Sequence, residues 1–285
     1  MQPRRSLIFT PGVRPEMYPK ALRTGADIVT IDLEDAIAPG DKDTARERTL
    51  ALFVDPPATG GVEPIVRVNS LRSPEGLKDI LAILATETPP PAIMLPKVTS
   101  PEEVLWADDL LTGVHAAIRF HVIIETCDGL DRAYEIARAS DRIDSLLFGA
   151  ADMAAELRVP LQWEPLLYAR SRVVHAAARA MIDVIDVPWL DLDDMDGMER
   201  EAKAAAALGF TGKGAIHPKQ IPALNRCFGA DPDAVAQAKR VIGAFEANPD
   251  GLLVVDGKLI EKPVLRSMYR LVALAERAAE QGEAK

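Results

Sequence analysis

The sequence predicts a parallel α/β fold, and in particular a closed barrel of eight strands. Apolar, β-branched runs of strand length recur along the chain with helical stretches between them, which is typical of βα units. Two acidic residues one such unit apart, Glu125 in FHVIIET and Asp152 in LLFGAAD, each close an apolar run. Because the carboxyl ends of parallel strands share one face, these carboxylates can converge on one cation.

Eight segments are interpreted as strands with their exits: residues 6–12, 27–35, 64–69, 92–98, 120–126, 145–152, 180–186 and 214–218. A count of eight favours a (β/α)8 barrel. The alternative is a doubly wound open sheet. It is less favoured because no glycine-rich dinucleotide fingerprint follows the first strand.

Helix boundaries support this count. A capping side chain directly precedes proline at the first helical position in three places: Ser73-Pro74, Ser100-Pro101 and Asp231-Pro232. Glu103 stands three residues after Ser100, as in a capping box. Gly209 is placed to end the alanine-rich helix that begins near Met198.

The chain continues well beyond the last predicted strand. We therefore predict a catalytic barrel over residues 1–222 and an extension over 223–285 that acts as a lid or an oligomerisation segment. The extension holds a helix over 231–247, a hairpin in VVDGKLI with an Asp-Gly turn, and an amphipathic helix from about Pro263.

Composition excludes several functional classes. The formal net charge of -10 argues against a protein that binds nucleic acid or an anionic membrane, since such proteins present basic surfaces. No apolar run approaches the ~20 residues of a membrane span, and the N-terminal apolar run is too short for a signal peptide. The two cysteines, Cys127 and Cys227, lack metal spacing, so we expect a cytoplasmic protein.

The predicted mouth of the barrel favours a metal site. Glu125 and Asp152 are the expected ligands of Mg²⁺, which prefers oxygen donors, and Mn²⁺ is an acceptable substitute. Glu34 and Asp35, after the second strand, are then expected to hold metal-bound water. The alternative for any one of these carboxylates is a helix cap or a loop ion pair.

Two cationic residues belong to the same predicted mouth. Arg67 lies inside PIVRVN, where its planar guanidinium can bind a substrate carboxylate bidentately or form a structural ion pair with Glu34 or Asp35. Lys97, in MLPKV, either binds substrate as well or supports the carboxylate cluster.

Three further features are less informative about the function. Asp186 is a further ligand, a loop cap or a repulsive element, and its role stays open. His217, followed by Pro218, is interpreted mainly as a turn residue. The run DLDDMDG, residues 191–197, lacks the acidic twelfth position of a calcium loop and is interpreted as the start of a helix.

An ordered set of segments resembles the citrate lyase beta subunit family, which includes malyl-CoA and citramalyl-CoA lyases. The matching segments, in chain order, are RRSLIFTPG, GADIVTIDLEDAI with Lys42 and Ala45-Arg46 after it, VRVN, MLPKV, IIETCDGL, FGAADM, GFTGKGAIHPKQI and DGKLIEKPVL. They span nearly the whole chain.

The resemblance implies a phosphoenolpyruvate-binding-type TIM barrel that binds Mg²⁺ and cleaves a carbon-carbon bond in a 3-hydroxyacyl-CoA thioester. It implies that Glu125 and Asp152 bind the metal, with Glu125 also beside the substrate, and that Arg67 binds the substrate carboxylate. Several family lyases carry a catalytic aspartate where this chain has Glu261, delivered from a neighbouring subunit.

The resemblance also implies partners. Arg5, Arg14 and Arg23 are candidates for the CoA phosphates, and an exchanged C-terminal segment suggests a homo-oligomer, a trimer or hexamer. Two alternatives keep the same site: a thioesterase, and a subunit that needs acyl-carrier and transferase partners. An aldolase acting on free keto acids is ranked last, because no histidine lies near the second strand.

Overall fold

A computed structural model describes residues 3–247 and, beyond them, 253–255, 258–260 and isolated positions at 265, 268–269, 271–272 and 275–276. The chain divides into two compact units. One is Arg4–Phe228, and the other comprises residues 1–3 and 229–285. The lid or oligomerisation role predicted for residues 223–285 stays a prediction.

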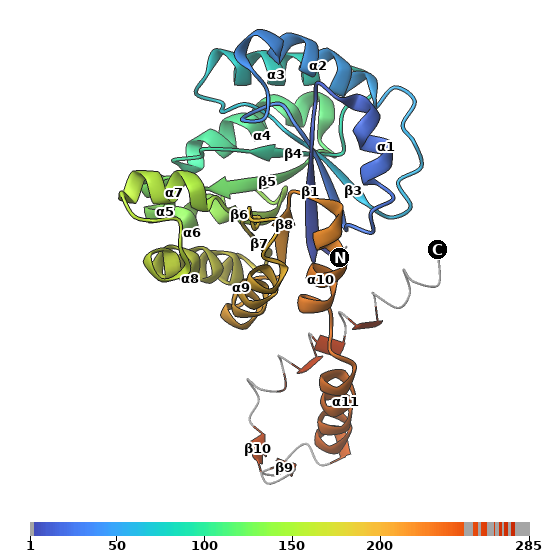
Figure 1. Ribbon diagram of the computed structural model, residues 1–285, viewed down its shortest axis with the longest axis vertical. Coiled ribbons are helices and arrows are strands. Elements are labelled where there is room, and N and C mark those ends of the chain that lie inside the picture. The colour runs from blue at the N-terminus through green and yellow to red at the C-terminus, as the bar shows by residue number, and fades with distance from the viewer. Residues whose placement is uncertain are drawn as a thin grey trace. The chain divides into compact units, whose positions relative to one another are not determined.

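The first unit is a closed barrel of eight parallel strands in sequential order, with β1 paired to β8 (Figure 1). This confirms the predicted fold class. The strands are β1 (Ser6–Pro11), β2 (Ile28–Asp32), β3 (Glu63–Arg67), β4 (Ala92–Leu95), β5 (Arg119–Ile124), β6 (Ile143–Phe148), β7 (Asp183–Asp186) and β8 (Gly212–Ala215).

Two predicted strand limits were wrong. Strand β7 begins at Asp183, because Ala180 still belongs to the preceding helix and Met181 ends that helix in a left-handed conformation. Strand β6 ends at Phe148, and the residues that follow Gly149 begin a helix. Asp152 therefore lies on a helix and does not close a strand.

Alternation along the strands produces two apolar layers. One set of side chains fills the barrel interior. It comprises Leu7, Ile28, Ile65, Ala92, Met94, Ile123, Leu147 and Ile185. The opposite strand faces pack against the surrounding helices in a larger continuous core. Both faces of the sheet are therefore covered, and most strand residues are buried, as expected of a parallel sheet.

The helices follow the strands around the barrel. They are α1 (Tyr18–Ala21), α2 (Lys42–Ala51), α3 (Pro74–Ala85), α4 (Pro101–His115), α5 (Cys127–Asp131), α6 (Ala133–Ala137), α7 (Ala150–Leu157), α8 (Trp163–Ala180), α9 (Met195–Leu208) and α10 (Ile221–Cys227). Among the residues described, no helix is long and apolar enough to cross a membrane.

Most predicted helix ends are confirmed. The Ser73 hydroxyl accepts a hydrogen bond from the Gly76 amide, and Gly209 ends α9 with φ +114°. The capping box at Ser100 was wrong. Glu103 instead accepts hydrogen bonds from the amide and hydroxyl of Thr99, one residue earlier, and Ser100 makes no capping bond.

The second unit contains α11 (Pro232–Ala247) and the antiparallel pair β9 (Leu253–Val255) and β10 (Lys258–Ile260). The predicted helix and the antiparallel pairing of the two strands are confirmed. The hairpin turn and Glu261 lie outside the described residues, as does most of the helix expected from Pro263.

Two helical glycines provide a test of packing. A Cβ on Gly76 would lie 2.1 Å from the Ser70 carbonyl oxygen, whereas a Cβ on Gly113 would meet no atom within 4 Å. We expect Gly76→Ala to lower the free energy of unfolding by about 1–3 kcal/mol. Gly113→Ala should raise it by about 0.5–1 kcal/mol, because alanine restricts the unfolded chain. Urea unfolding of both variants measures this, and a change of equal sign would contradict it.

Candidate active site

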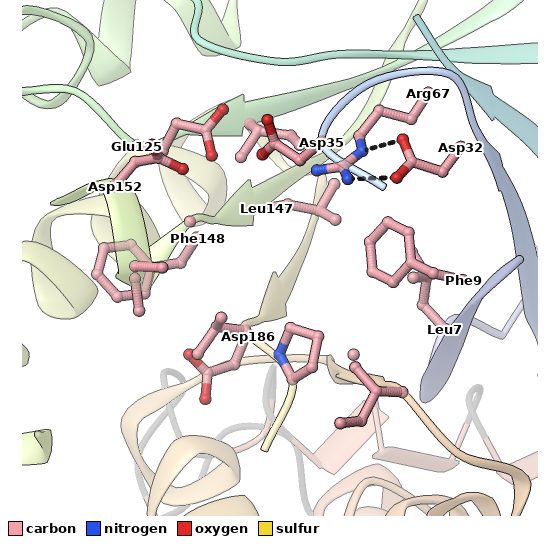
Figure 2. Close-up of a pocket in the computed structure, with 18 of the residues that line it drawn as sticks. Leu7, Phe9, Asp32, Asp35, Arg67, Glu125, Leu147, Phe148, Asp152 and Asp186 are labelled. Atoms are coloured by element: carbon pink, nitrogen blue, oxygen red, sulfur yellow. Dashed lines mark hydrogen bonds and ion pairs between the residues drawn. The ribbon is translucent and has the colours of Figure 1, made fainter. Parts of the chain in front are cut away.

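A cavity of about 360 Å³ opens among the carboxyl ends of the strands (Figure 2). Most of its wall is apolar, and carboxylates and one guanidinium interrupt that wall. The lining residues are Leu7, Phe9, Asp32, Asp35, Ala36, Arg67, Ile123, Glu125, Leu147, Phe148, Gly149, Ala150, Ala151, Asp152, Asp186, Val187, Pro188, Gly214 and Ile216.

Glu125 directly follows β5 and is only 4% exposed. Its Oε1 accepts a hydrogen bond of 2.8 Å from the Lys97 amide, and Lys97 adopts a left-handed φ of +54°. Burial raises the pKa of Glu125 to about 8, helped by the negative charges of Glu34 and Asp152 and opposed by the Lys97 amide. A cation would relieve this accumulation of negative charge.

Gly149 makes room for Glu125. A Cβ at this position would lie 2.4 Å from both Cβ and Oε2 of Glu125, so any larger residue displaces the carboxylate. Sequence reasoning did not single out this glycine. The available signal was a glycine at the exit of a buried strand, which marks a close approach by another group.

Asp152 reaches the site from the first turn of α7. The helix begins immediately after Gly149, so its first turn carries Asp152 beside Glu125, as Figure 2 shows. Asp152 is half-buried, and in the part of the chain that the structure describes it makes no hydrogen bond or ion pair. The structure therefore brings together the two predicted metal ligands, although their role as ligands stays a proposal.

Arg67, the last residue of β3, is held by Asp32, the last residue of β2. Its Nε and Nη2 donate to the two Asp32 oxygens at 2.8 and 2.7 Å, and Nη1 lies 3.1 Å from Glu34 Oε2. Its guanidinium also lies 5.1 Å from the centre of the Phe9 ring. Burial opposes the charge of Arg67, but Asp32 and Glu34 outweigh this and raise its pKa.

The predicted ion pair of Arg67 was correct for Glu34, and Asp32 was missed. Asp32 also accepts hydrogen bonds from the amides of Glu34 and Ala36, so it fixes the loop that follows β2. It could have been found as the acid ending the run IVTID beside the strand that carries Arg67.

Lys97 neutralises the two carboxylates of that loop. Its Nζ lies 2.6 Å from Glu34 Oε1 and 3.1 Å from Asp35 Oδ1. This matches the expectation that Lys97 supports the carboxylate cluster, and substrate binding by Lys97 stays a prediction. Burial raises the pKa of Glu34, while Arg67 and Lys97 oppose the rise. Asp35 is exposed and lines the cavity.

Asp186 lines the opposite side of the cavity but is already paired. Its Oδ1 accepts from Arg170 Nε at 3.0 Å, and its Oδ2 accepts from Lys213 Nζ at 2.6 Å. Lys213 is fully buried and also binds Glu201 at 2.7 Å. Sequence reasoning missed Lys213, whose signal was a lysine inside the strand GKGA.

His217 has a structural role, as predicted. Its Nδ1 accepts the Lys219 amide, and the Gln220 side chain completes a capping box with the His217 backbone. Arg5 binds Asp27 at the amino end of β1 and does not line the cavity, so it is a poor candidate for CoA phosphates. Arg14 and Arg23 are exposed.

A separate polar cluster lies near the amino ends of β3, β5 and β6. Ligand atoms of Glu63, His121 and Asp144 come within 4.8 Å of one another, the spacing of a metal site. Arg4 already occupies this cluster, with bonds to Glu63 at 2.7 and 2.9 Å and to Asp144 at 2.8 Å. Its guanidinium supplies the positive charge, so we do not assign a metal here.

Residues 5–218 match the family model described as HpcH/HpaI aldolase/citrate lyase. The chain belongs to this family. The lyase family predicted from the sequence segments is therefore confirmed.

The chain is 32% identical to the L-malyl-CoA/beta-methylmalyl-CoA lyase of Cereibacter sphaeroides, over 96% of this chain and 95% of that protein. It is 30% identical to the mitochondrial citramalyl-CoA lyase of Homo sapiens, over 98% and 87%. Among solved structures, CitE of Mycobacterium tuberculosis in complex with magnesium, acetoacetate and coenzyme A matches with a TM-score of 0.79 and 28% identity, over 96% of this chain and 98% of that one.

The buried carboxylate predicts a pH-dependent stability in the metal-free protein. Folded Glu125, with a pKa of about 8, binds a proton more tightly than the unfolded chain, so stability falls as pH rises from the unfolded pKa near 4.5 through 8. Removing this charge in Glu125→Gln should raise the free energy of unfolding at pH 9 by roughly 1–4 kcal/mol, with little gain at pH 5.

Thermal and urea unfolding in EDTA at both pH values measure this effect. Glu135→Gln, at an exposed position of α6, is the matched control and should change little. An equal gain for Glu125→Gln at pH 5 and pH 9 would show that the effect is not due to ionisation.

Proposed function

We propose that the protein is a Mg²⁺-dependent carbon-carbon lyase acting on a 3-hydroxyacyl-CoA thioester of the malyl-, citramalyl- or citryl-CoA type. It releases an acetyl-CoA-type thioester and a 2-keto acid by retro-Claisen cleavage. The observation that carries this proposal is the convergence of Glu125, Asp152 and Arg67 on one cavity at the carboxyl end of the barrel.

The carboxylates fit a small divalent cation. Glu125 is buried beside two other negative charges, and Asp152 has no partner among the described residues. Such oxygen donors suit Mg²⁺, with Mn²⁺ as a substitute. When bound, the cation would polarise the oxygen that becomes the ketone and offset the negative charge that develops there. Glu34 and Asp35 are proposed to orient water beside it.

Arg67 is proposed to bind the substrate carboxylate. Asp32 and the Phe9 ring fix the plane of its guanidinium before substrate arrives, so little conformational entropy is lost on binding. The apolar wall keeps water away from the reacting carbon atoms. Lys97 holds Glu125 through its backbone amide and Glu34 through its side chain.

The reaction needs a base for the substrate hydroxyl. As that proton leaves, the bond between the carbinol carbon and the thioester α-carbon breaks, and its electron pair passes into a thioester enolate that then takes up a proton. Glu261 is our candidate for the base. It lies outside the described residues, and its delivery from a neighbouring subunit of a trimer or hexamer is part of this proposal, as is a cytoplasmic location.

The alternatives are a thioesterase on the same site and a subunit that depends on acyl-carrier and transferase partners. Similarity over nearly the whole chain to proteins named as malyl-CoA and citramalyl-CoA lyases favours a self-sufficient lyase.

Product analysis tests this choice. We expect purified protein incubated with citramalyl-, malyl- or citryl-CoA to release keto acid without free thiol in the presence of Mg²⁺, and to release neither in EDTA. Thiol without keto acid would identify a thioesterase. Neither product with any thioester, in a folded protein supplied with Mg²⁺, would argue for dependence on partner subunits.

Asp152→Asn tests the metal site. We expect kcat/KM to fall at least ~10²-fold, because the amide removes a charged ligand while keeping its shape. Unfolding in EDTA should change little. Asp196→Asn, at an exposed acidic position in the first turn of α9, controls for the loss of a helix-dipole interaction and should retain activity. Retained activity in Asp152→Asn would remove the metal-site argument.

A further inference from the structure

We infer that the cavity selects a substrate with a single carboxylate and an apolar alkyl group on the carbon that bears the hydroxyl. This inference rests on the proposed function and concerns the substituent at one carbon. In malyl-, citramalyl- and citryl-CoA that substituent is hydrogen, methyl and carboxymethyl, respectively, so the three thioesters form a matched series. The structure assigns the preference to methyl or a slightly larger alkyl group.

The cavity wall carries more negative than positive side chains. Among the described residues that line the cavity, Arg67 is the one cation, against carboxylates at Asp32, Asp35, Glu125, Asp152 and Asp186. Arg67 already shares its guanidinium with Asp32 and Glu34. One substrate carboxylate can still approach it, but a second would find no cationic partner on this wall.

Nearby cations do not change this conclusion. Lys97 Nζ is bound to Glu34 and Asp35, and it does not line the cavity. Lys213 and Arg170 are buried behind Asp186, where Asp186 and Glu201 balance their charges. Even with a divalent cation at Glu125 and Asp152, the carboxylates of this wall outnumber its cationic groups. A second substrate carboxylate would therefore be desolvated beside other negative charges, which disfavours binding.

Phe9, Leu7 and Leu147 form an apolar floor of the cavity beside Arg67. Phe9 contacts the Arg67 guanidinium and also lines the cavity. Leu7 lies two residues earlier on the same face of β1, and Leu147 enters from β6 between Phe9 and the Glu125 side, as Figure 2 shows. A substrate held at Arg67 by its carboxylate thus has an alkyl substituent within reach of Phe9, Leu7 and Leu147.

The apolar part of the cavity wall extends far enough to contact an alkyl substituent. The floor is continuous with the barrel interior, where Leu7, Ile123 and Leu147 belong to the same buried cluster. Gly214, the neighbour of Leu7 on β8, lets Pro188 pack closely beside this surface, since a Cβ there would lie 2.6 Å from Pro188 Cγ. Hydrogen at the carbinol carbon leaves this apolar surface without a contact, whereas a methyl group covers part of it.

The test measures kcat/KM of the wild-type protein for the three thioesters with Mg²⁺. We expect citramalyl-CoA to exceed malyl-CoA by about 10-fold, the usual discrimination for one methyl group in an apolar pocket. We expect it to exceed citryl-CoA by at least ~10²-fold, because the extra carboxylate has no partner. A wild-type protein that cleaves citryl-CoA or malyl-CoA best overturns the inference but leaves the proposed lyase function intact. Cleavage of none of the three contradicts both.

A charge insertion tests the cause of the preference. Ile216 lines the cavity, and its 41% exposure allows a charged side chain without burial of the charge. Ile216→Arg should raise the citryl-CoA to citramalyl-CoA ratio of kcat/KM at least ~10-fold. Leu81→Arg, on an exposed face of α3, adds the same charge away from the cavity and should leave the ratio unchanged. An unchanged ratio in a folded Ile216→Arg protein, or equal changes in both variants, would overturn the electrostatic explanation.

Discussion

The architecture of the site depends on placing several carboxylates at one end of a barrel without enough cations to neutralise them. Glu34 is paired with Lys97 and Arg67, and Asp32 is paired with Arg67. Among the described residues, Glu125 receives only the Lys97 backbone amide, and its raised pKa reflects this deficit. Under the proposed function this deficit would favour a bound cation and lower the stability of the protein in its absence, a common relation between function and stability at active sites.

The two ends of the barrel differ in how their carboxylates are paired. At the amino ends of the strands, Arg4 pairs with Glu63, Asp144 and Asp183, and Arg119 also pairs with Asp144. Each of these carboxylates therefore has an arginine partner, unlike Glu125 and Asp152 in the described part of the chain. At the carboxyl ends, compensation is incomplete around Glu125 and the walls are apolar. This contrast is the reason we place the chemistry at the cavity and not at the Glu63 cluster, although both gather potential metal ligands.

Family membership agrees with the charge distribution of the cavity but does not by itself identify the substrate. The relatives act on different thioesters according to their names, so likeness alone leaves the substrate open. Residues that distinguish substrates lie on the cavity wall, and their charge and shape belong to this chain. Arg67, Phe9 and Leu147 are the wall residues that bear on substrate choice in this chain.

The sequence by itself determined the barrel, the strand order and the candidate ligands Glu125 and Asp152. It could do so because local periodicity and capping residues mark each βα unit, and because parallel strands end on one face. It did not reveal that Asp152 lies on a helix, that Asp32 binds Arg67, that Lys213 binds Asp186 or that Gly149 leaves space for Glu125. Those features are contacts between residues far apart in the chain. Only closure of the barrel decides them, because side-chain distance, burial and charge balance arise from packing between strands and have no local sequence signal.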